Sequence, residues 1–263
     1  MADNKITFFG KSDGISVEQL IRYSRFNMNV KHFHNQYEIF YIIEGERQFF
    51  FDNKSYNAYA GDIAILDTNL VHTTCSISDE DKGYNRVILY IDYEKMCDFD
   101  KKYPGLNLVN YFHNNYGIYH LNEDQRIAFL NLYRDLRHEL TKKNSGYQSR
   151  VEIATIYWLY KLLSLKHDST QIHAVINSPK ELSASNISAY LEANYTKELA
   201  LDTISDELFM SKYYMCRIFK EYTGFTISEY VNTLRIKKAT QILESSNLSI
   251  SAVSYTHLRA HET

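Results

Sequence analysis

The sequence predicts an α+β protein: a β-rich amino-terminal part that ends in a pair of helices, followed by an all-α carboxy-terminal part. Two observations predict this fold class. Short runs of β-branched and aromatic residues, separated by turn residues, occupy about the first 120 of the 263 residues. From Glu123 onward, apolar residues recur every three or four positions, which is the period of an α-helix.

The composition excludes several classes of protein. Lys and Arg number 29 and Asp and Glu 32, so the net charge is −3 at pH 7 and any nucleic-acid-binding surface has to be local. The three cysteines are an odd number without CxxC spacing, which excludes a disulfide framework and favours a reducing compartment. No apolar run reaches the roughly 18 residues of a membrane span, and the amino terminus has no apolar signal segment. We expect a soluble cytoplasmic protein with no membrane partner.

The strands of the amino-terminal part are predicted from runs that end at turn residues. These runs are Ile39–Ile43, Gln48–Phe51, Gly61–Leu66 and Asn85–Ile91. Their short, regular spacing is typical of a β-sandwich or barrel. In the run from Glu38 to Ile43 both alternating sets are largely apolar, so we expect that strand to be covered on both faces.

Two amphipathic helices are predicted next. Asn122 is a suitable N-cap for the first, and Asn144-Ser-Gly146 ends it. The apolar stripe of the first helix is Ile127, Leu130, Tyr133, Leu136 and Leu140, and that of the second is Val151, Ala154, Trp158, Leu159, Leu162 and Leu163. A short turn makes them an antiparallel pair, whose outer apolar surface is buried by the β domain, by a second subunit, or by both.

Periodicity lapses between about Lys166 and Ser183, which we interpret as a linker. Four helices are predicted beyond it. The first is marked by Ile187, Leu191 and Tyr195, and the others are Leu201–Leu208, Lys212–Tyr222 and about Ser228–Leu243. The predicted domains are therefore 1–165, a linker at 166–183, and 184–263.

Histidine and glutamate gather in the first predicted domain. His32, His34 and Glu38 share parity on an extended chain, so their side chains leave the same face, and His72 follows the Gly61-Asp62 turn. The spacing HxHx3Ex6G, then Gly-Asp and a later His, resembles the two motifs of the cupin β-barrel. This resemblance implies that the four residues line the barrel mouth, where cupins often hold a divalent metal.

The second cupin motif departs from the family pattern, because Asp67-Thr-Asn69 stands where many cupins have Pro-x-Gly. His32, His34, Glu38 and His72 therefore remain candidates for two kinds of site, one for an organic effector and one for a metal ion. A third interpretation is that they only close the mouth of the barrel.

Charge is segregated in the carboxy-terminal helices. Residues 180–209 carry a net charge of −4, and residues 210–243 carry +4. Ser211 is a suitable N-cap for the helix that follows, and Met215, Ile218 and Phe219 form its apolar stripe. A positive surface gathered around one short helix is typical of a DNA-binding protein. The alternative is that these charges only form the solvent-exposed face of a helix.

The residues around that helix make the prediction specific. They read Ser211-Lys-Tyr-Tyr-Met-Cys-Arg217-Ile-Phe219-Lys220, followed at fixed spacings by Gly224, Tyr230, Arg235, Ala239 and Leu243. From about Ile187 to Ile250 the chain resembles the AraC-type transcription regulators, over their first helix-turn-helix and the connecting helix. In that family a cupin-like effector and dimerisation domain commonly precedes the DNA-binding domain.

The resemblance implies roles for single residues. Lys212–Tyr222 becomes the recognition helix. Its resemblance to the family places Tyr213, Cys216 and Arg217 toward base edges in the major groove, and Ser211, Lys212 and Lys220 nearer the phosphates. The planar guanidinium of Arg217 suits bidentate pairing with guanine. We expect Arg235 to pair with a carboxylate inside the domain rather than to contact DNA.

The family has a second helix-turn-helix after the connecting helix. Leu248–Val253 resembles its beginning, but Ser254-Tyr-Thr-His-Leu-Arg-Ala-His-Glu-Thr263 has no stripe or N-cap for a second recognition helix. We interpret this segment as a truncation or a foreign tail. The 263-residue chain is therefore expected to bind DNA weakly or not at all.

These inferences predict an N-terminal cupin-like β-barrel with a helical pair, followed by an all-α helix-turn-helix domain. The expected function is sequence-specific, effector-responsive transcription regulation, without catalysis and with no cofactor other than a divalent metal in the cupin site. The expected partners are double-stranded DNA, a small-molecule effector and a second copy of the chain. The rival hypothesis is a cupin metalloenzyme, a dioxygenase or isomerase, with a helical appendage. The complete histidine–glutamate set supports it and the DNA-reader pattern argues against it.

Overall fold

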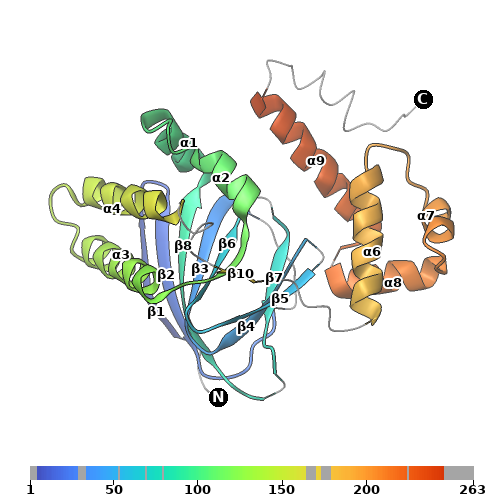
Figure 1. Ribbon diagram of the computed structural model, residues 1–263, viewed down its shortest axis with the longest axis horizontal. Coiled ribbons are helices and arrows are strands. Elements are labelled where there is room, and N and C mark those ends of the chain that lie inside the picture. Colours follow the sequence, from blue (N-terminus) through green and yellow to red (C-terminus); the bar gives the residue numbers. More distant parts are fainter. Residues whose placement is uncertain are drawn as a thin grey trace. The chain divides into compact units, whose positions relative to one another are not determined.

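The computed structural model describes residues 5–28, 34–52, 54–68, 70–78, 80–163, 170–172, 179–223 and 225–245. His32 and the carboxy-terminal segment from residue 246 onward lie outside these ranges, so the expectations placed on them stay predictions. The chain divides into two compact units, residues 1–175 and 176–263, and each is described by itself (Figure 1). None of the helices in the described ranges is long and apolar enough to cross a membrane.

The first unit contains two antiparallel sheets. The larger has the strand order β1-β2-β8-β3-β6-β9-β10 and the smaller the order β5-β4-β7. The strands of the larger sheet are β1 (Lys5–Ser12), β2 (Ile15–Arg22), β3 (Gln36–Glu44), β6 (Asp62–Leu66), β8 (Tyr84–Asp92), β9 (Gly117–His120) and β10 (Thr170–Gln171). Those of the smaller are β4 (Glu46–Phe51), β5 (Lys54–Tyr59) and β7 (His72–Cys75).

The two sheets face each other across an apolar interior, and we call this arrangement the barrel (Figure 1). Phe40 of β3 and Phe49 of β4 meet there, with ring centroids 5.0 Å apart. The opposite face of β3 contributes Ile39 and Tyr41 to a second cluster, shared with the helices. Strand β3 is thus covered on both faces, as the sequence predicts, and all four predicted strands are confirmed.

Two helices interrupt the region that the sequence analysis assigns to strands alone. They are α1 (Tyr93–Lys102) and α2 (Leu108–Asn115). Each buries two apolar residues spaced three or four apart, Met96 with Phe99 and Leu108 with Phe112. The Asp100 carboxylate accepts hydrogen bonds from the backbone N–H of the first two residues of α2, at 2.6 and 3.0 Å. The expectation of a purely β region up to residue 120 is therefore wrong.

The predicted helical pair is present as α3 (Glu123–Lys142) and α4 (Tyr147–Leu162). Asn122 caps α3 through a reciprocal pair of 2.9 Å bonds with Gln125, which confirms the predicted start. Of the apolar stripe predicted for α3, Leu136 and Leu140 are buried within the first unit, whereas Ile127 is 50% exposed and Leu130 is 38% exposed. The residues that α3 buries are Phe129, Leu132, Leu136 and Leu140.

Both ends of the predicted linker contain regular structure. Thr170 and Gln171 form β10, which pairs with His120 and Tyr119 of β9 and so belongs to the sheet of the first unit. At the other end, α6 begins at Pro179, inside the segment assigned to the linker. The pairing of β10 with β9, which joins segments far apart in the sequence, is not revealed by local periodicity.

The second unit consists, over its described residues, of α6 (Pro179–Asn194), α7 (Leu201–Glu207), α8 (Lys212–Thr223) and α9 (Ile227–Ser245). All four predicted helices are confirmed. Their shared core is built from Ile187, Leu191, Ile204, Met215, Ile218, Phe219, Ile227, Tyr230 and Val231. The apolar stripe predicted for the recognition helix is therefore the face by which α8 packs.

Arg235 holds two of these helices together. Its Nε donates to the carbonyl oxygen of Tyr195 at 2.8 Å and its Nη2 to that of Lys197 at 3.0 Å. These carbonyls lie just beyond the end of α6, where backbone oxygens lack helical partners. The expected role inside the domain is confirmed. The expected carboxylate partner is wrong, because backbone oxygens take its place.

Candidate ligand site and nucleic-acid interface

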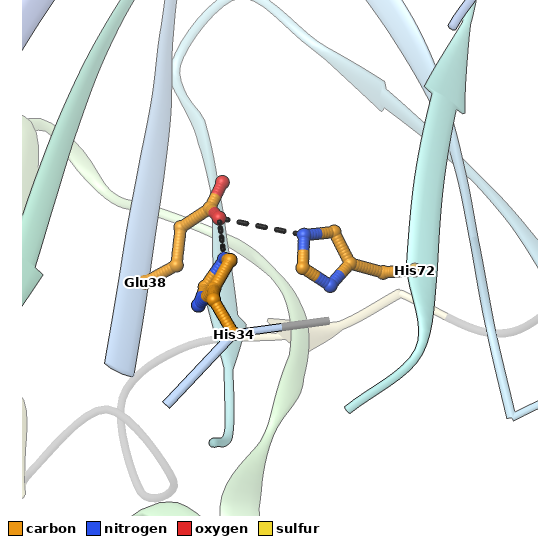
Figure 2. A group of neighbouring side chains, drawn as sticks. All are labelled: His34, Glu38 and His72. Atoms are coloured by element: carbon orange, nitrogen blue, oxygen red, sulfur yellow. Dashed lines mark hydrogen bonds and ion pairs between the residues drawn. The ribbon is translucent and has the colours of Figure 1, made fainter. Parts of the chain in front are cut away.

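Three polar side chains meet inside the barrel (Figure 2). Oε2 of Glu38 on β3 lies 2.9 Å from Nε2 of His34, within hydrogen-bond distance, and 3.4 Å from Nε2 of His72, the first residue of β7. Glu38 and His72 are buried, and the side chain of His34 is 22% exposed. The cluster is thus open to solvent on the His34 side.

Backbone carbonyls orient both imidazole rings. Nδ1 of His34 lies 3.0 Å from the oxygen of Gln36, and Nδ1 of His72 lies 2.8 Å from the oxygen of Leu70. Because a carbonyl oxygen only accepts, each Nδ1 carries a hydrogen. In the neutral imidazole, Nε2 of each ring then directs a lone pair toward Glu38. In the imidazolium, Nε2 carries a second hydrogen, which it donates to the Glu38 carboxylate.

The cluster stabilises the charged forms of Glu38 and His72. Burial by itself would raise the pKa of the Glu38 carboxyl, but hydrogen bonds from His34 and His72 and the charges of both rings hold it well below its ordinary value. Burial by itself would lower the pKa of His72, but its bond to Glu38 and the charge of that carboxylate raise it above its ordinary value. Glu38 is therefore an ionised acceptor at neutral pH.

The cluster also has the chemistry of a metal site. The candidate ligand atoms of His34, Glu38 and His72 all lie within 4.8 Å of one another. Two imidazoles and a carboxylate suit zinc, iron, manganese, nickel or copper. Hydrogen bonds from Nδ1 to carbonyls are the outer contacts that normally orient metal-binding histidines.

The structure brings together three of the four residues that the sequence predicts for this site, and His32 lies outside the described residues. Sequence reasoning misses Tyr90, whose ring meets that of His34 edge-on with centroids 5.6 Å apart. Tyr90 is directly opposite Glu38 in the pairing of β8 with β3. Alternation along 85–91 shows that Tyr90 shares a face with Ile88, but it does not reveal which strand lies beside it.

Helix α8 presents an aromatic and basic surface on the side away from its core. Tyr213 is 79% exposed, the Arg217 side chain is 47% exposed, and Lys220 is exposed. Arg217 lies 3.8 Å from the Glu221 carboxylate, and Lys212 forms an ion pair with Asp202 of α7. Ion pairs between exposed groups contribute little, so both cations remain available to phosphates or bases.

The other two residues predicted to face DNA, Ser211 and Cys216, make contacts within the second unit. Ser211 accepts at Oγ from the Tyr214 N–H at 3.3 Å, which confirms it as the N-cap of α8. Cys216 is half-buried and packs against the core of the unit. The sequence gives no signal that Phe209, in the turn before α8, is exposed. Its exposed fraction is 96%, and its backbone is left-handed with φ of 53°.

The first unit is a barrel with a buried histidine–glutamate cluster, and the second is a helix-turn-helix unit whose reading helix is exposed and basic. Together these two units define a ligand-responsive DNA-binding protein. Two family models match the chain. The AraC-like ligand binding domain matches residues 19–157, more than half of the chain, and the bacterial regulatory helix-turn-helix proteins of the AraC family match residues 191–232. The chain belongs to the AraC family of transcription regulators, with a ligand-binding domain and a helix-turn-helix DNA-binding domain.

Individual relatives agree with this family. The chain is 24% identical over 234 residues to the uncharacterised HTH-type transcriptional regulator YbfI of Bacillus subtilis, covering 86% of this chain and 77% of YbfI. It is 31% identical over 100 residues to the transcriptional activator RhaS of Escherichia coli, covering 38% and 35% of the two chains.

Two solved structures are similar at low sequence identity. ToxT from Vibrio cholerae O395 is 16% identical with a TM-score of 0.38, over 92% of this chain and 87% of ToxT. The AraC-like transcriptional activator CuxR is 12% identical with a TM-score of 0.41, over 87% and 76% of the two chains.

Proposed function

We propose that the effector of this regulator binds inside the barrel at His34, Glu38 and His72, together with His32, and that α8 reads DNA through Tyr213, Cys216 and Arg217. Ser211, Lys212 and Lys220 contact phosphates. The observation that carries the proposal is the buried carboxylate between two carbonyl-oriented imidazoles, a polar centre that is costly to bury inside the barrel. Since DNA is its proposed partner, we propose that the protein acts in the cytoplasm.

The same residues are proposed as ligands for a divalent metal. His34 and His72 would bind through Nε2 and Glu38 through a carboxylate oxygen, because both Nδ1 atoms are engaged with carbonyls. A bound ion would act as a Lewis acid and hold an oxygen or nitrogen of the effector. We propose that the protein performs no catalysis of its own.

Metal titration of the purified chain tests the site and its rival. Zinc and nickel are expected to bind with a stoichiometry of one, and His72→Ala is expected to weaken binding about 10- to 100-fold. His113→Ala, a partly exposed histidine paired with Asp67, is the matched control and should leave affinity unchanged. Binding that survives His72→Ala would contradict the site, and stoichiometric iron with turnover would favour the cupin enzyme.

Arg217 carries the prediction for DNA recognition. Arg217→Met is expected to lose about 1–3 kcal/mol of discrimination at one base pair, which is about a 5- to 150-fold loss of preference, because the bidentate contact to a guanine is removed. Because the 263-residue chain is expected to bind DNA weakly, the measurement is fluorescence anisotropy at low salt, where phosphate contacts are strongest, with duplexes selected from a random library by the unmodified protein.

Lys220→Met distinguishes recognition of a base from contact with the phosphate backbone. Losing a phosphate contact should weaken binding similarly for all duplexes and reduce the salt slope by about one. If Arg217→Met behaves in this way too, with its base preference intact, then Arg217 contacts the backbone and the proposed reading of DNA is wrong.

The outer surface of α3 and α4 is proposed as the dimer interface. Ile153, Tyr157 and Tyr160 of α4 are 58–62% exposed, and Ile127 of α3 is half exposed. Between the two helices lies a groove of about 190 Å³, lined in part by Leu132, Ala154 and Trp158. Exposed apolar side chains beside such a groove are typical of a surface that is covered by another protein.

Ile153→Glu is therefore expected to raise the dimer dissociation constant by about 100-fold or more, because it would bury an unpaired carboxylate in the interface. Sedimentation equilibrium measures the change. Gln148→Glu, at an exposed polar position of α4, adds the same charge away from the apolar residues and should leave the dissociation constant unchanged. A monomeric unmodified protein at tens of micromolar would contradict the proposed interface.

A further inference from the structure

A second charged cluster lies inside the barrel, separate from the histidines. Arg47 of β4 is 0% exposed. Its Nη1 donates to the Phe26 carbonyl at 2.7 Å and to Ser76 Oγ at 3.4 Å, and its Nη2 donates to Thr74 Oγ1 at 2.8 Å. All these acceptors are neutral. Within the described part of the chain, no carboxylate lies within ion-pair distance of Arg47, and its Nε–H has no acceptor.

Two further guanidinium groups surround the same position. Arg22 donates from Nε to the Tyr84 hydroxyl at 3.2 Å, and the Arg47 guanidinium lies 4.5 Å from the centre of the Tyr84 ring. Arg86 pairs with Glu18 at 2.7 Å, while its buried Nη1 has no acceptor among the described residues. Burial lowers the pKa of Arg47, and the charges of Arg22 and Arg86 lower it further, as expected of cations that crowd together.

The charges in this cluster do not balance. Three guanidinium groups, Arg22, Arg47 and Arg86, share one carboxylate, that of Glu18, among the described residues. A buried charge without a counter-charge is strongly unfavourable, and buried donors are normally hydrogen-bonded. Two buried N–H groups, on Arg47 and on Arg86, have no acceptor among the described residues, and an acceptor that carries negative charge would also supply the missing counter-charge.

Strand register places Arg86 on the same inner face of the larger sheet as Glu38. Arg86 is directly opposite Ile42, and Tyr90 is directly opposite Glu38. Residues opposite each other share a face, so Arg86 lies four residues from Glu38 along β3, roughly 13 Å at the rise of a strand. Phe40 and Ile88, which pair with each other, line the inner face between the two polar centres.

We propose that the effector is an organic acid with an apolar body. Its carboxylate accepts hydrogen bonds from Arg47 and Arg86, and its body lies along Phe40 and Ile88 toward Glu38. The two oxygens of a carboxylate match the two donors that lack acceptors. The proposal rests on the proposed function in one respect, that the barrel interior holds the effector, and it adds the chemical class of the ligand and a second anchoring centre.

Isothermal titration of the full chain at constant ionic strength tests the ligand class. The probes are benzoate and decanoate, each compared with its neutral analogue, benzamide or decanol. At least one acid is expected to bind about 10- to 100-fold more tightly than its analogue, because the carboxylate adds charge-assisted hydrogen bonds. Equal affinities for acid and analogue, or no binding of either acid at millimolar concentration, would overturn the proposal.

Variants identify the site. Arg47→Met is expected to weaken binding of the acid about 10- to 100-fold and to leave the neutral analogue unaffected. Arg150→Met removes an exposed arginine of α4 and should change nothing. If Arg47→Met does not fold, Arg22→Met reports on the same positive centre from a less buried position, and it should weaken acid binding at least several-fold.

His72→Ala distinguishes this inference from the proposed function. Acid binding that is lost in Arg47→Met but kept in His72→Ala supports the arginine centre and contradicts an effector site at the histidines. Acid binding that is kept in Arg47→Met but lost in His72→Ala overturns the inference and leaves the histidine site standing. Loss in both variants supports a ligand that spans the two centres.

Discussion

Phe219→Ala is expected to lower the melting temperature of the second unit by more than about 10 °C and to leave the transition of the barrel unchanged. Phe219 is 0% exposed, and its ring meets that of Tyr230 edge-on at 5.4 Å. Removing a buried phenyl ring costs about 3–5 kcal/mol, a large fraction of the roughly 4–13 kcal/mol typical of a unit of this length. Differential scanning calorimetry of the full chain measures both transitions.

Tyr213→Ala is the matched control, since it is also an aromatic-to-alanine change on α8. Tyr213 is 79% exposed, so its loss should change stability by no more than about 0.5 kcal/mol, while it weakens DNA binding. In the stability assay Phe219→Ala should therefore have a large effect and Tyr213→Ala almost none. In the DNA-binding assay Tyr213→Ala should weaken binding. Equal destabilisation by both variants would show that α8 does not have the buried and exposed faces described above.

Glu38→Gln is expected to destabilise the barrel by about 3–5 kcal/mol near pH 6, because it breaks a buried ion pair and leaves the histidines without their carboxylate. A chelator is present throughout, so that bound metal does not contribute. The measurement is thermal unfolding of the first unit as a function of pH, followed by near-ultraviolet circular dichroism.

The pH dependence follows from the two pKa shifts. The pKa of Glu38 is lowered in the folded protein, so its contribution to stability is present above the ordinary value of 4.5 and is lost as the pH falls through the folded value. The pKa of His72 is raised, so its contribution is present below the ordinary value of 6.5 and is lost as the pH rises through the folded value. The pair therefore stabilises the barrel most between about pH 4.5 and 6.5.

In Glu38→Gln this maximum should flatten. Glu80→Gln, which removes an exposed carboxylate paired with Lys82, is the control and should retain the profile of the unmodified protein. A Glu38→Gln variant whose stability keeps the same maximum would mean that the histidine–glutamate cluster is not the source of the pH dependence.

Much of the candidate site is predictable because its signals are local. The common parity of His34 and Glu38 depends only on the alternation of an extended strand, and Glu38 and His72 do meet. Arg47 gives no such signal. It alternates with Phe49 and Phe51 on β4, and its burial without a carboxylate partner depends on Thr74, Phe26 and Tyr84, which reach it from other segments.

The sequence by itself determined the strands that end at turn residues, the Asn122 cap and the division of α8 into buried and exposed faces. Each of these depends on residues within one or two turns of chain, where side-chain spacing and capping chemistry decide the structure. Only the tertiary structure decided that Phe129 of α3 is buried while Ile127 is exposed, that α1 and α2 interrupt the strands, and that Tyr90 faces Glu38. α3 carries apolar residues on two sides, Ile127 and Leu130 on one and Phe129 and Leu132 on the other, so periodicity alone does not decide which side is buried. The two short helices are marginal alone, and contacts with distant segments select the outcome.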